Sequence, residues 1–191
     1  MEFVREIKNC IPDEYCDRLI ERFTLDARRK PGETVGGVNP NWKKSLDLRV
    51  GNLSDWADVN QTLTQKVRDG LSEYVKYCDD NDMSRMNLIK HMLHDDVVIH
   101  APVIQQTEEG GFYRWHHDSI FTAHVRILTY IFYLNDVPVE HGGCTEFLMG
   151  KKIQPKKGTL ILFPATWTYI HRGKKLEKGN KYIATGFVYG D

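Results

Sequence analysis

The chain has 191 residues, and its 26 lysines and arginines balance its 26 aspartates and glutamates, so the formal net charge is zero. A chain of this length forms one domain with a substantial core and is too short for two full catalytic domains. Balanced charge produces no overall field that would attract nucleic acid or an anionic membrane. The composition therefore predicts a single domain, residues 1–191, whose partner is a peptide or small molecule rather than nucleic acid or a membrane. It leaves the oligomeric state open.

The cysteines indicate a reducing compartment. Cys10, Cys16, Cys78 and Cys144 are scattered without a C-x-x-C pair, and the first residues lack the apolar run of a signal peptide. We therefore expect free thiols and a cytoplasmic location. No stretch approaches the roughly 18 to 20 apolar residues that a membrane-spanning helix needs, so we expect a soluble protein.

The first half of the chain predicts two amphipathic helices separated by a loop. Apolar residues recur at helical spacing from Pro12 to about residue 24, and again from about Ser54 to Tyr77. Residues 28–43 are rich in glycine, proline and asparagine, which favour a loop. Such a loop is either a lid over a site or a disordered connection. A short strand is expected at residues 45–50, and residues 1–96 as a whole are expected to be mainly helical support with this lid region.

From residue 97 the pattern changes to strands. Runs rich in β-branched and aromatic residues alternate with turns; they cover residues 97–106, 126–135, 158–165 and 181–190. Helices followed by many short antiparallel strands indicate an α+β protein. The expected core, residues 97–190, is a sandwich or jelly roll that is open at one end.

A candidate metal site centres on the tripeptide His116-His117-Asp118. In a strand, alternate side chains share a face, so His116 and Asp118 can point into one pocket. If the fold brings His171 beside them, the result is a facial triad of two histidines and one carboxylate, which leaves positions open on a non-haem Fe(II). The H-x-D spacing alone is weak because it occurs often by chance, and surface or capping histidines are the simpler interpretation.

Two strands carry polar groups on faces that are otherwise apolar. Strict alternation in residues 126–135 puts Ile127, Thr129, Ile131 and Tyr133 on one face and Arg126, Leu128, Tyr130, Phe132 and Leu134 on the other. In the last strand one face carries Lys181, Ile183, Thr185 and Phe187. An inward ammonium needs a counter-charge, which a ligand carboxylate would provide. The alternatives are that Tyr133 lies at the rim of a doubly buried sheet and that Lys181 reaches solvent at the end of its strand.

A string of motifs in this half resembles the 2-oxoglutarate and Fe(II)-dependent oxygenases of the prolyl 4-hydroxylase-like branch. The segments are GGFYRWHHD at 110–118, Arg126 followed by Tyr133-Leu134-Asn135, GGCTEF at 142–147, PKKGTL at 155–160, Phe163-Pro164, His171-Arg172-Gly173 and Lys181-Tyr182. Each motif is weak alone, but their joint order and spacing are strong. The resemblance covers roughly residues 97–190, about half of the chain.

The resemblance implies a fold and a site. The fold would be a double-stranded β-helix, or jelly roll, with the N-terminal helices packed on one sheet. His116, Asp118 and His171 would be the iron ligands. Lys181 and Tyr133 would bind the distal carboxylate of 2-oxoglutarate, in a pocket lined by Thr129, Ile131 and Thr185. Residues that would face the substrate are Tyr113, Arg126 and Trp167, although the face of Arg126 given by alternation does not support its place there. The implied cofactors are Fe(II), 2-oxoglutarate and dioxygen, with ascorbate as a candidate addition.

The implied activity is hydroxylation of a C–H bond with release of succinate and CO2, and prolyl residues of a peptide or protein are one candidate substrate. Hydroxylation of a free amino acid or another small molecule is the alternative. A catalytically inactive jelly roll that binds a metal or ligand is a third hypothesis, and a purely structural motif string with His171 facing solvent is a fourth. The sequence departs from the pattern of this branch at two places. Gln106 and Thr107 occupy the stretch where the branch often has a cofactor-binding tyrosine, which Tyr113 need not replace, and Cys144 has no interpretation.

Overall fold

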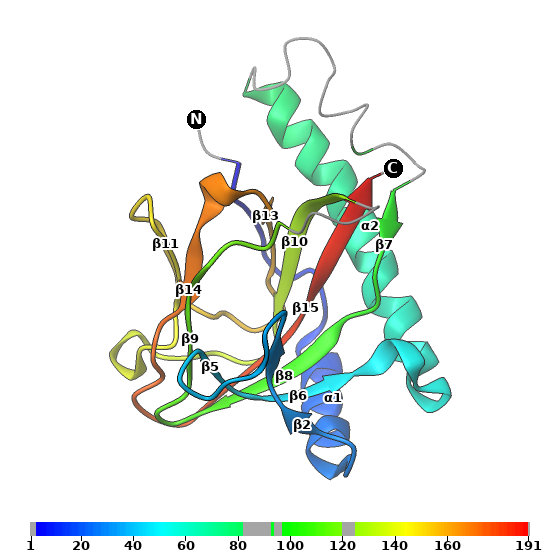
Figure 1. Cartoon of the computed structure of the whole chain (residues 1–191). Helices are drawn as coiled ribbons and strands as arrows, with labels where there is room; N and C mark the ends of the chain where they lie inside the picture. Colours follow the sequence, from blue (N-terminus) through cyan, green and yellow to red (C-terminus); the bar gives the residue numbers. More distant parts are fainter. Residues whose placement is uncertain (1–2, 82–92, 94–96, 120–124, 191) are drawn as a thin grey trace.

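Two antiparallel sheets face each other and enclose the centre of the molecule (Figure 1). The computed structural model describes residues 3–81, 93, 97–119 and 125–190. The larger sheet contains, in spatial order, β1 (Arg5–Ile7), β13 (Leu160–Pro164), β10 (Val125–Tyr133), β15 (Asn180–Gly190), β8 (Val103–Glu108), β6 (Leu46–Arg49) and β2 (Lys30–Pro31), with β7 (Val98–Ile99) paired to β15. The smaller sheet contains β12 (Lys152–Ile153), β11 (Thr145–Phe147), β14 (His171–Gly173), β9 (Phe112–His116) and β5 (Lys43–Lys44).

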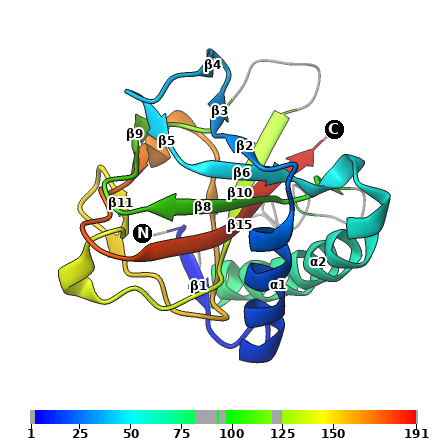
Figure 2. The same cartoon turned by 90° about the horizontal axis from the view of Figure 1, so that it is seen from below.

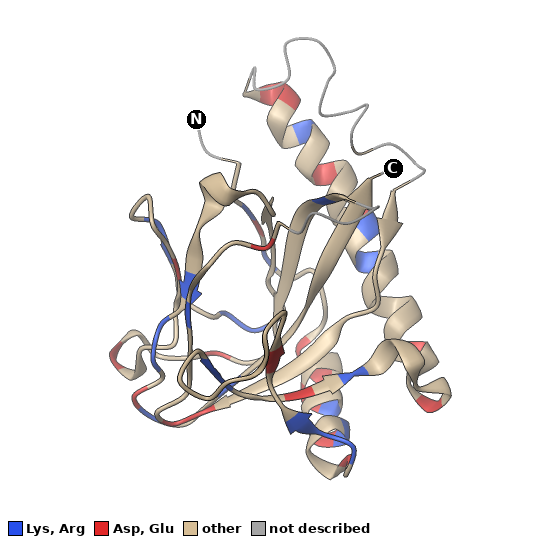
Figure 3. Cartoon of the chain, viewed as in Figure 1, with Lys and Arg blue, Asp and Glu red and all other residues tan. Residues whose placement is uncertain are grey.

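The two predicted helices cover one side of the larger sheet (Figure 2). Helix α1 (Asp13–Leu25) follows Pro12 and has two acidic residues in its first turn, which favours a helix N-terminus. Helix α2 (Ala57–Asp80) is entered through the 3₁₀ turns η1 (Val50–Asn52) and η2 (Ser54–Trp56). Acidic and basic residues are interspersed along both helices (Figure 3). None of the helices in the described part of the chain is both long and apolar enough to span a membrane.

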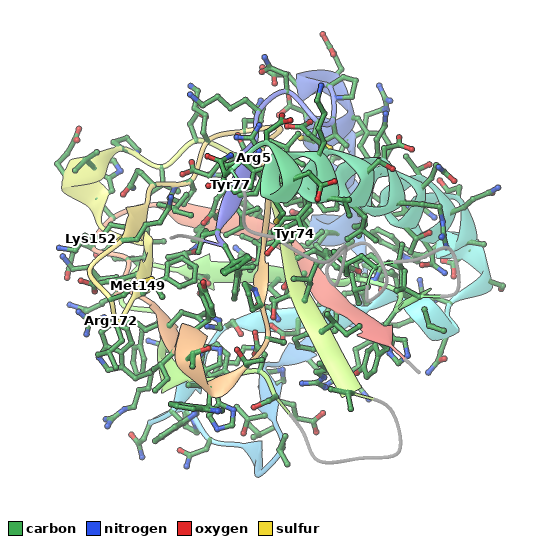
Figure 4. All side chains as sticks on the ribbon, turned by 90° about the horizontal axis from the view of Figure 1, so that it is seen from above. Arg5, Tyr74, Tyr77, Met149, Lys152 and Arg172 are labelled. Carbon is green, nitrogen blue, oxygen red and sulfur yellow. The ribbon has the colours of Figure 1, made fainter. Side chains whose placement is uncertain are left out.

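The main core lies between these helices and the larger sheet. The helices contribute Leu19, Phe23, Leu63 and Val67, and the sheet contributes Leu128, Tyr130, Phe132, Leu160, Leu162 and Val188, all at most 3% exposed. Helix α2 also holds the N-terminal strand (Figure 4): the Tyr74 hydroxyl donates to the Phe3 carbonyl, and the Arg5 guanidinium lies 5.0 Å from the centroid of the Tyr77 ring. The helices thus bury the outer face of the sheet, as predicted.

A second cluster lies between the two sheets. It consists of Val4, Ile131, Tyr133, Phe147, Ile153, Ile161 and Phe163. Residues of β10 therefore alternate between the two cores, with Phe132 on the helix side and Ile131 and Tyr133 on the inner side. The α+β class and the double-stranded β-helix are confirmed by this arrangement of two sheets and two covering helices.

Strict alternation fails at the start of β10. The pairing register with β15 shifts between Arg126 and Leu128, which is a β-bulge. Ile127 consequently packs against the helix-side core, and Arg126 lies over the ring of Phe187 on the inner side. The predicted faces of Arg126 and Ile127 are therefore wrong, because one extra residue at the bulge resets the alternation.

The first half of the chain contributes more strand than predicted. The segment expected to be a loop contains β2, the hairpin formed by β3 (Glu33–Thr34) and β4 (Gly37–Val38), and β5. Strand β5 pairs with β9 of the smaller sheet, whereas β6 pairs with β8 of the larger sheet. Residue Ser45 therefore links the two sheets. Two-residue strands carry too few side chains to show a period, which is why their sequence did not indicate them.

Candidate metal centre and co-substrate pocket

Three side chains converge at one point between the sheets. His116 ends β9, His171 begins β14, and these two residues are directly paired across the smaller sheet. Asp118 lies two residues beyond the end of β9. The Nε2 atom of His116 is 3.6 Å from Asp118 Oδ1, and the Nε2 atom of His171 is 3.5 Å from Asp118 Oδ2. One nitrogen or oxygen from each residue lies within 4.8 Å of the others, so together they could hold one metal ion.

Backbone contacts fix which imidazole nitrogen is available to a metal. The Nδ1 atom of His116 lies 2.7 Å from the Arg114 carbonyl oxygen, and the Nδ1 atom of His171 lies 3.0 Å from the Tyr169 carbonyl oxygen. A carbonyl only accepts hydrogen bonds, so both Nδ1 atoms must carry the proton. Both Nε2 lone pairs are then free and point toward Asp118, which is how metal-binding histidines are usually oriented.

The surroundings keep His116 neutral. Its side chain is 11% exposed, and the Tyr113 ring stacks on it with centroids 3.6 Å apart and planes 20° apart. Burial, aided by the neighbouring His171, lowers the pKa of His116 to about 4. A neutral imidazole is the form that binds a metal.

The three groups open into a cavity of about 540 Å³, a size typical of small-molecule sites. Its inner wall includes Thr129, Ile131, Lys181, Ile183 and Thr185, which are side chains predicted to face inward. Lys181 is the notable one because its side chain is buried and its ammonium donates to the Gly143 carbonyl at 2.7 Å. Among the described residues no carboxylate lies within ion-pair distance of it. Burial lowers the pKa of Lys181 to about 8.

A glycine pair shapes the wall next to Lys181. Gly142 and Gly143 have φ angles of 71° and 67°, in the left-handed region that favours glycine. A Cβ atom at position 143 would lie 2.7 Å from Leu176 Cδ1. Glycine at this position therefore lets the backbone turn so that its carbonyl reaches the buried ammonium.

Tyr133 was expected to bind the distal carboxylate of 2-oxoglutarate together with Lys181. It is fully buried behind the cavity wall, outside the cavity lining, and its hydroxyl donates to Thr145 Oγ1 at 2.7 Å. Thr145, which does line the cavity, was not singled out from the sequence although it belongs to the motif at 142–147. Tyr133 thus orients a cavity hydroxyl, and its own ring lies 5.7 Å from Lys181 Nζ.

Of the three residues expected to face a substrate, two line the cavity and one does not. Tyr113 and Arg126 line the cavity, and Arg126 does so because of the bulge. Its guanidinium donates to the Tyr189 hydroxyl and to the Asp118 carbonyl oxygen. Trp167 is 70% exposed on the 3₁₀ turn η4 (Trp167–Tyr169) and is absent from the cavity lining. Of the pair noted as a departure, Thr107 lines the cavity, whereas Gln106 faces Asn180 and donates to its side-chain oxygen.

Sequence reasoning missed a polar cluster in the cavity wall. Lys43 and Asp47 form a buried ion pair of 2.7 Å, and Ser45 and Gln105 also donate to the Asp47 carboxylate. Lys43 Nζ lies 5.3 Å from the centroid of the Tyr113 ring. Lys43, Ser45 and Asp47 come from the segment that links the two sheets, and Gln105 comes from β8, so no local pattern could have indicated that they share the cavity with the histidines.

The residues present fit Fe(II) and 2-oxoglutarate. Two neutral imidazoles and one carboxylate match the facial triad of non-haem Fe(II) oxygenases, and three ligands leave positions open for other groups. The buried ammonium of Lys181, in the same cavity and without a carboxylate partner among the described residues, matches an anionic ligand group. A dicarboxylic acid that reaches from the triad to Lys181 would satisfy both.

The comparison with protein families also points to Fe(II) and 2-oxoglutarate. Residues 102–189 match the family model described as the 2OG-Fe(II) oxygenase superfamily. The matched segment contains the three candidate metal ligands and Lys181. A curated protein that the chain resembles, a PKHD-type hydroxylase of Synechococcus sp. (strain CC9902), is 28% identical over 94 residues, which are 47% of this chain and 41% of that protein. The match thus spans less than half the length of that relative.

The solved structures that resemble this chain include three prolyl hydroxylases. The viral collagen prolyl hydroxylase of Paramecium bursaria Chlorella virus-1, solved with 2OG, has a TM-score of 0.69 at 20% identity over 100% of this chain and 97% of its own. A prolyl-4-hydroxylase of Pseudomonas putida has a TM-score of 0.68 at 14% identity, with 100% and 94% covered. A Trichoplax adhaerens prolyl hydroxylase in complex with a hypoxia inducible factor peptide fragment has a TM-score of 0.70 at 17% identity, with 100% and 84% covered. At these identities the likeness establishes the shared fold.

Proposed function

We propose that the chain is a 2-oxoglutarate- and Fe(II)-dependent dioxygenase that hydroxylates a C–H bond. One observation carries the proposal: the His116, Asp118 and His171 ligand atoms share a cavity with the buried ammonium of Lys181. A structural metal site would explain the triad, but not a neighbouring buried ammonium that has no carboxylate partner among the described residues. The two features together suit a co-substrate with one group at the metal and a carboxylate at Lys181.

Each side chain has a separate task in this proposal. His116, Asp118 and His171 hold the metal through Nε2 and carboxylate oxygens, and Lys181 pairs with the far carboxylate of 2-oxoglutarate. When bound, Fe(II) and 2-oxoglutarate supply oxidative chemistry in which dioxygen is consumed, 2-oxoglutarate becomes succinate and CO2, and one oxygen atom enters the substrate. Ile131 and Ile183 exclude water around the co-substrate chain. Retention of Asp118 favours hydroxylation, because related halogenases lack this carboxylate.

For the substrate we propose a prolyl residue in a peptide or protein. The support is the PKHD-type hydroxylase similarity and the shared fold with prolyl hydroxylases, one of them solved with a peptide. Tyr113 and Arg126 line the cavity and are the candidate substrate contacts. A free amino acid or another small molecule is the alternative outcome. Because the four cysteines are unpaired, we retain a cytoplasmic location as part of the proposal.

The direct test is succinate release from 2-oxoglutarate with Fe(II) under air. Wild type should release succinate, and proline-containing peptides should stimulate the release more than free amino acids do. His116→Ala and Asp118→Ala should abolish it. Thr159→Val is a matched control, because Thr159 is buried outside the cavity lining and its hydroxyl has no hydrogen-bond partner within the described part of the chain. If release is unchanged in the two ligand variants, the triad assignment is wrong. Release from wild type that no peptide or amino acid stimulates would contradict both proposed substrate classes.

A further inference from the structure

The two oxygens of Asp118 are in different environments. Oδ2 accepts a hydrogen bond from the Thr129 hydroxyl at 2.7 Å. No hydrogen bond to Oδ1 is found among the described residues. Oδ1 lies 3.6 Å from His116 Nε2, and Oδ2 lies 3.5 Å from His171 Nε2, so the Thr129 hydroxyl is what distinguishes the two oxygens. A carboxylate with one oxygen hydrogen-bonded and the other bare is prepared to bind a metal through the bare oxygen alone.

Strand β10 contacts Asp118 at two points, and the bulge makes this possible. Arg126 donates to the backbone carbonyl of Asp118 at 3.0 Å, while Thr129 donates to its side chain. Residues three apart on a regular strand point to opposite faces. The register shift between Arg126 and Leu128 brings both onto the inner face, so the bulge is what lets one strand hold both the backbone and the carboxylate of the same aspartate.

The position of Thr129 is fixed by the centre of the larger sheet. Its backbone pairs with Phe163 of β13 on one side and with Phe187 of β15 on the other, and its side chain is 2% exposed. Asp118, in contrast, lies beyond the end of its own strand, where no ladder holds it. The rigid partner of the pair is therefore the threonine, and the carboxylate takes its orientation from the hydroxyl.

We propose that Thr129 is a positioning residue that keeps Asp118 a one-oxygen ligand and so keeps coordination positions open. The inference rests on the proposed function, since it concerns the same metal. A facial triad has three positions left only if its carboxylate occupies one. Without the threonine hydroxyl, Oδ2 would be free to approach the metal as well, and the carboxylate would also lose its fixed orientation.

The test uses metal binding as well as turnover. Apoprotein is titrated with Co(II), whose visible spectrum reports coordination number, and with Mn(II) for affinity. Thr129→Val keeps the shape and removes the donor, and it should weaken metal binding by roughly 10- to 100-fold, as loss of such an outer partner typically does. Its Co(II) spectrum should also change. Thr129→Ser restores a hydroxyl and should restore both, whereas the same Thr→Val exchange at Thr159 should change neither.

A double-mutant cycle separates positioning from a general loss of structure. If Thr129 acts through Asp118, then adding Thr129→Val to Asp118→Ala should weaken the residual metal binding no further. Wild-type metal affinity and spectrum in Thr129→Val, or an equal loss in Thr129→Ser, would overturn the inference. His116→Ala distinguishes failure of the proposed function from failure of this inference. If His116→Ala binds metal as tightly as wild type, the proposed function is wrong. If His116→Ala loses the metal while Thr129→Val keeps it, only the positioning role of Thr129 is wrong.

Discussion

The two faces of strand β10 are built on different principles. Its helix side, with Leu128, Tyr130 and Phe132, is closed by apolar packing against α1 and α2. Its inner side carries Thr129, whose hydroxyl donates a hydrogen bond to the Asp118 carboxylate. The first face contributes to the free energy of folding, and the second uses that stability to hold a carboxylate in place. Substitutions on the two faces should therefore differ in what they change.

The largest expected effect is on the helix side. Phe132→Ala removes a fully buried ring and should lower the free energy of unfolding by about 3–5 kcal/mol. Urea denaturation of the apoprotein measures this. Metal affinity per folded molecule should stay at the wild-type value, with Phe132→Leu as a milder variant if the alanine variant does not fold. If Phe132→Ala kept the wild-type stability but bound metal more weakly, the helix side of β10 would not serve stability alone, and the proposed difference between the two faces would be wrong.

On the inner side, a substitution of Lys181 on the neighbouring strand β15 should weaken ligand binding and leave stability unchanged. Lys181→Met keeps the length of the side chain but removes the charge, and a hydrogen bond to a charged group is worth about 1.5–3 kcal/mol. The Kd for 2-oxoglutarate, measured by calorimetry with Mn(II) present, should rise by roughly 10- to 150-fold. Stability of the apoprotein should not fall, because an ammonium without a carboxylate partner has left the interior. Unaltered affinity for 2-oxoglutarate would remove Lys181 from the site.

The pH dependence of stability sharpens the same contrast. Burial lowers the pKa of Lys181 from 10.5 to about 8 in the folded protein. Between about pH 8 and 10 the unfolded chain therefore holds a proton that the folded chain has released, so the free energy of unfolding should rise with pH. The rise should be absent from Lys181→Met, measured by urea denaturation at each pH. Parallel pH profiles for the two proteins would contradict the lowered pKa.

The smallest effect is expected where α2 approaches the sheet. A Cβ atom at Gly70 would lie 2.7 Å from Leu160 Cδ2 and 3.3 Å from Ile7 Cδ1. Alanine is favoured over glycine within a helix by about 1 kcal/mol, whereas overpacking costs about 1–3 kcal/mol. Gly70→Ala should therefore lower the free energy of unfolding by about 1 kcal/mol in thermal denaturation. A gain in stability would mean that the helix can shift away without loss.

Periodicity predicted the parts of the fold that repeat over many residues. Both helices ended within three residues of their expected ends, and alternation placed Ile131 and Lys181 on the inner side. It failed where one residue changes the phase, as at Ile127, because a bulge needs no distinctive side chain. The strands between residues 30 and 44 were missed because each has only two residues.

The site was predictable in part from local pattern and in part only from resemblance. His116 and Asp118 were paired by their spacing, but the approach of His171 depends on pairing between β9 and β14, which are far apart in the sequence. Only the ordered motif string linked them. The Lys43–Asp47 pair was beyond both kinds of reasoning, because its place in the cavity follows from a crossing between sheets.

The crossing at Ser45 also bears on how the cavity could be re-engineered. The hairpin of β3 and β4 stands between two anchored points, the β2–β6 pairing and the β5–β9 pairing, and Glu33, Thr34 and Val35 reach the cavity wall. None of the residues from 33 to 38 belongs to the triad or to the Lys181 wall. The hairpin could therefore be replaced by one of different length or composition. Such a replacement would change this part of the cavity lining while both strand pairings and the metal ligands keep their register.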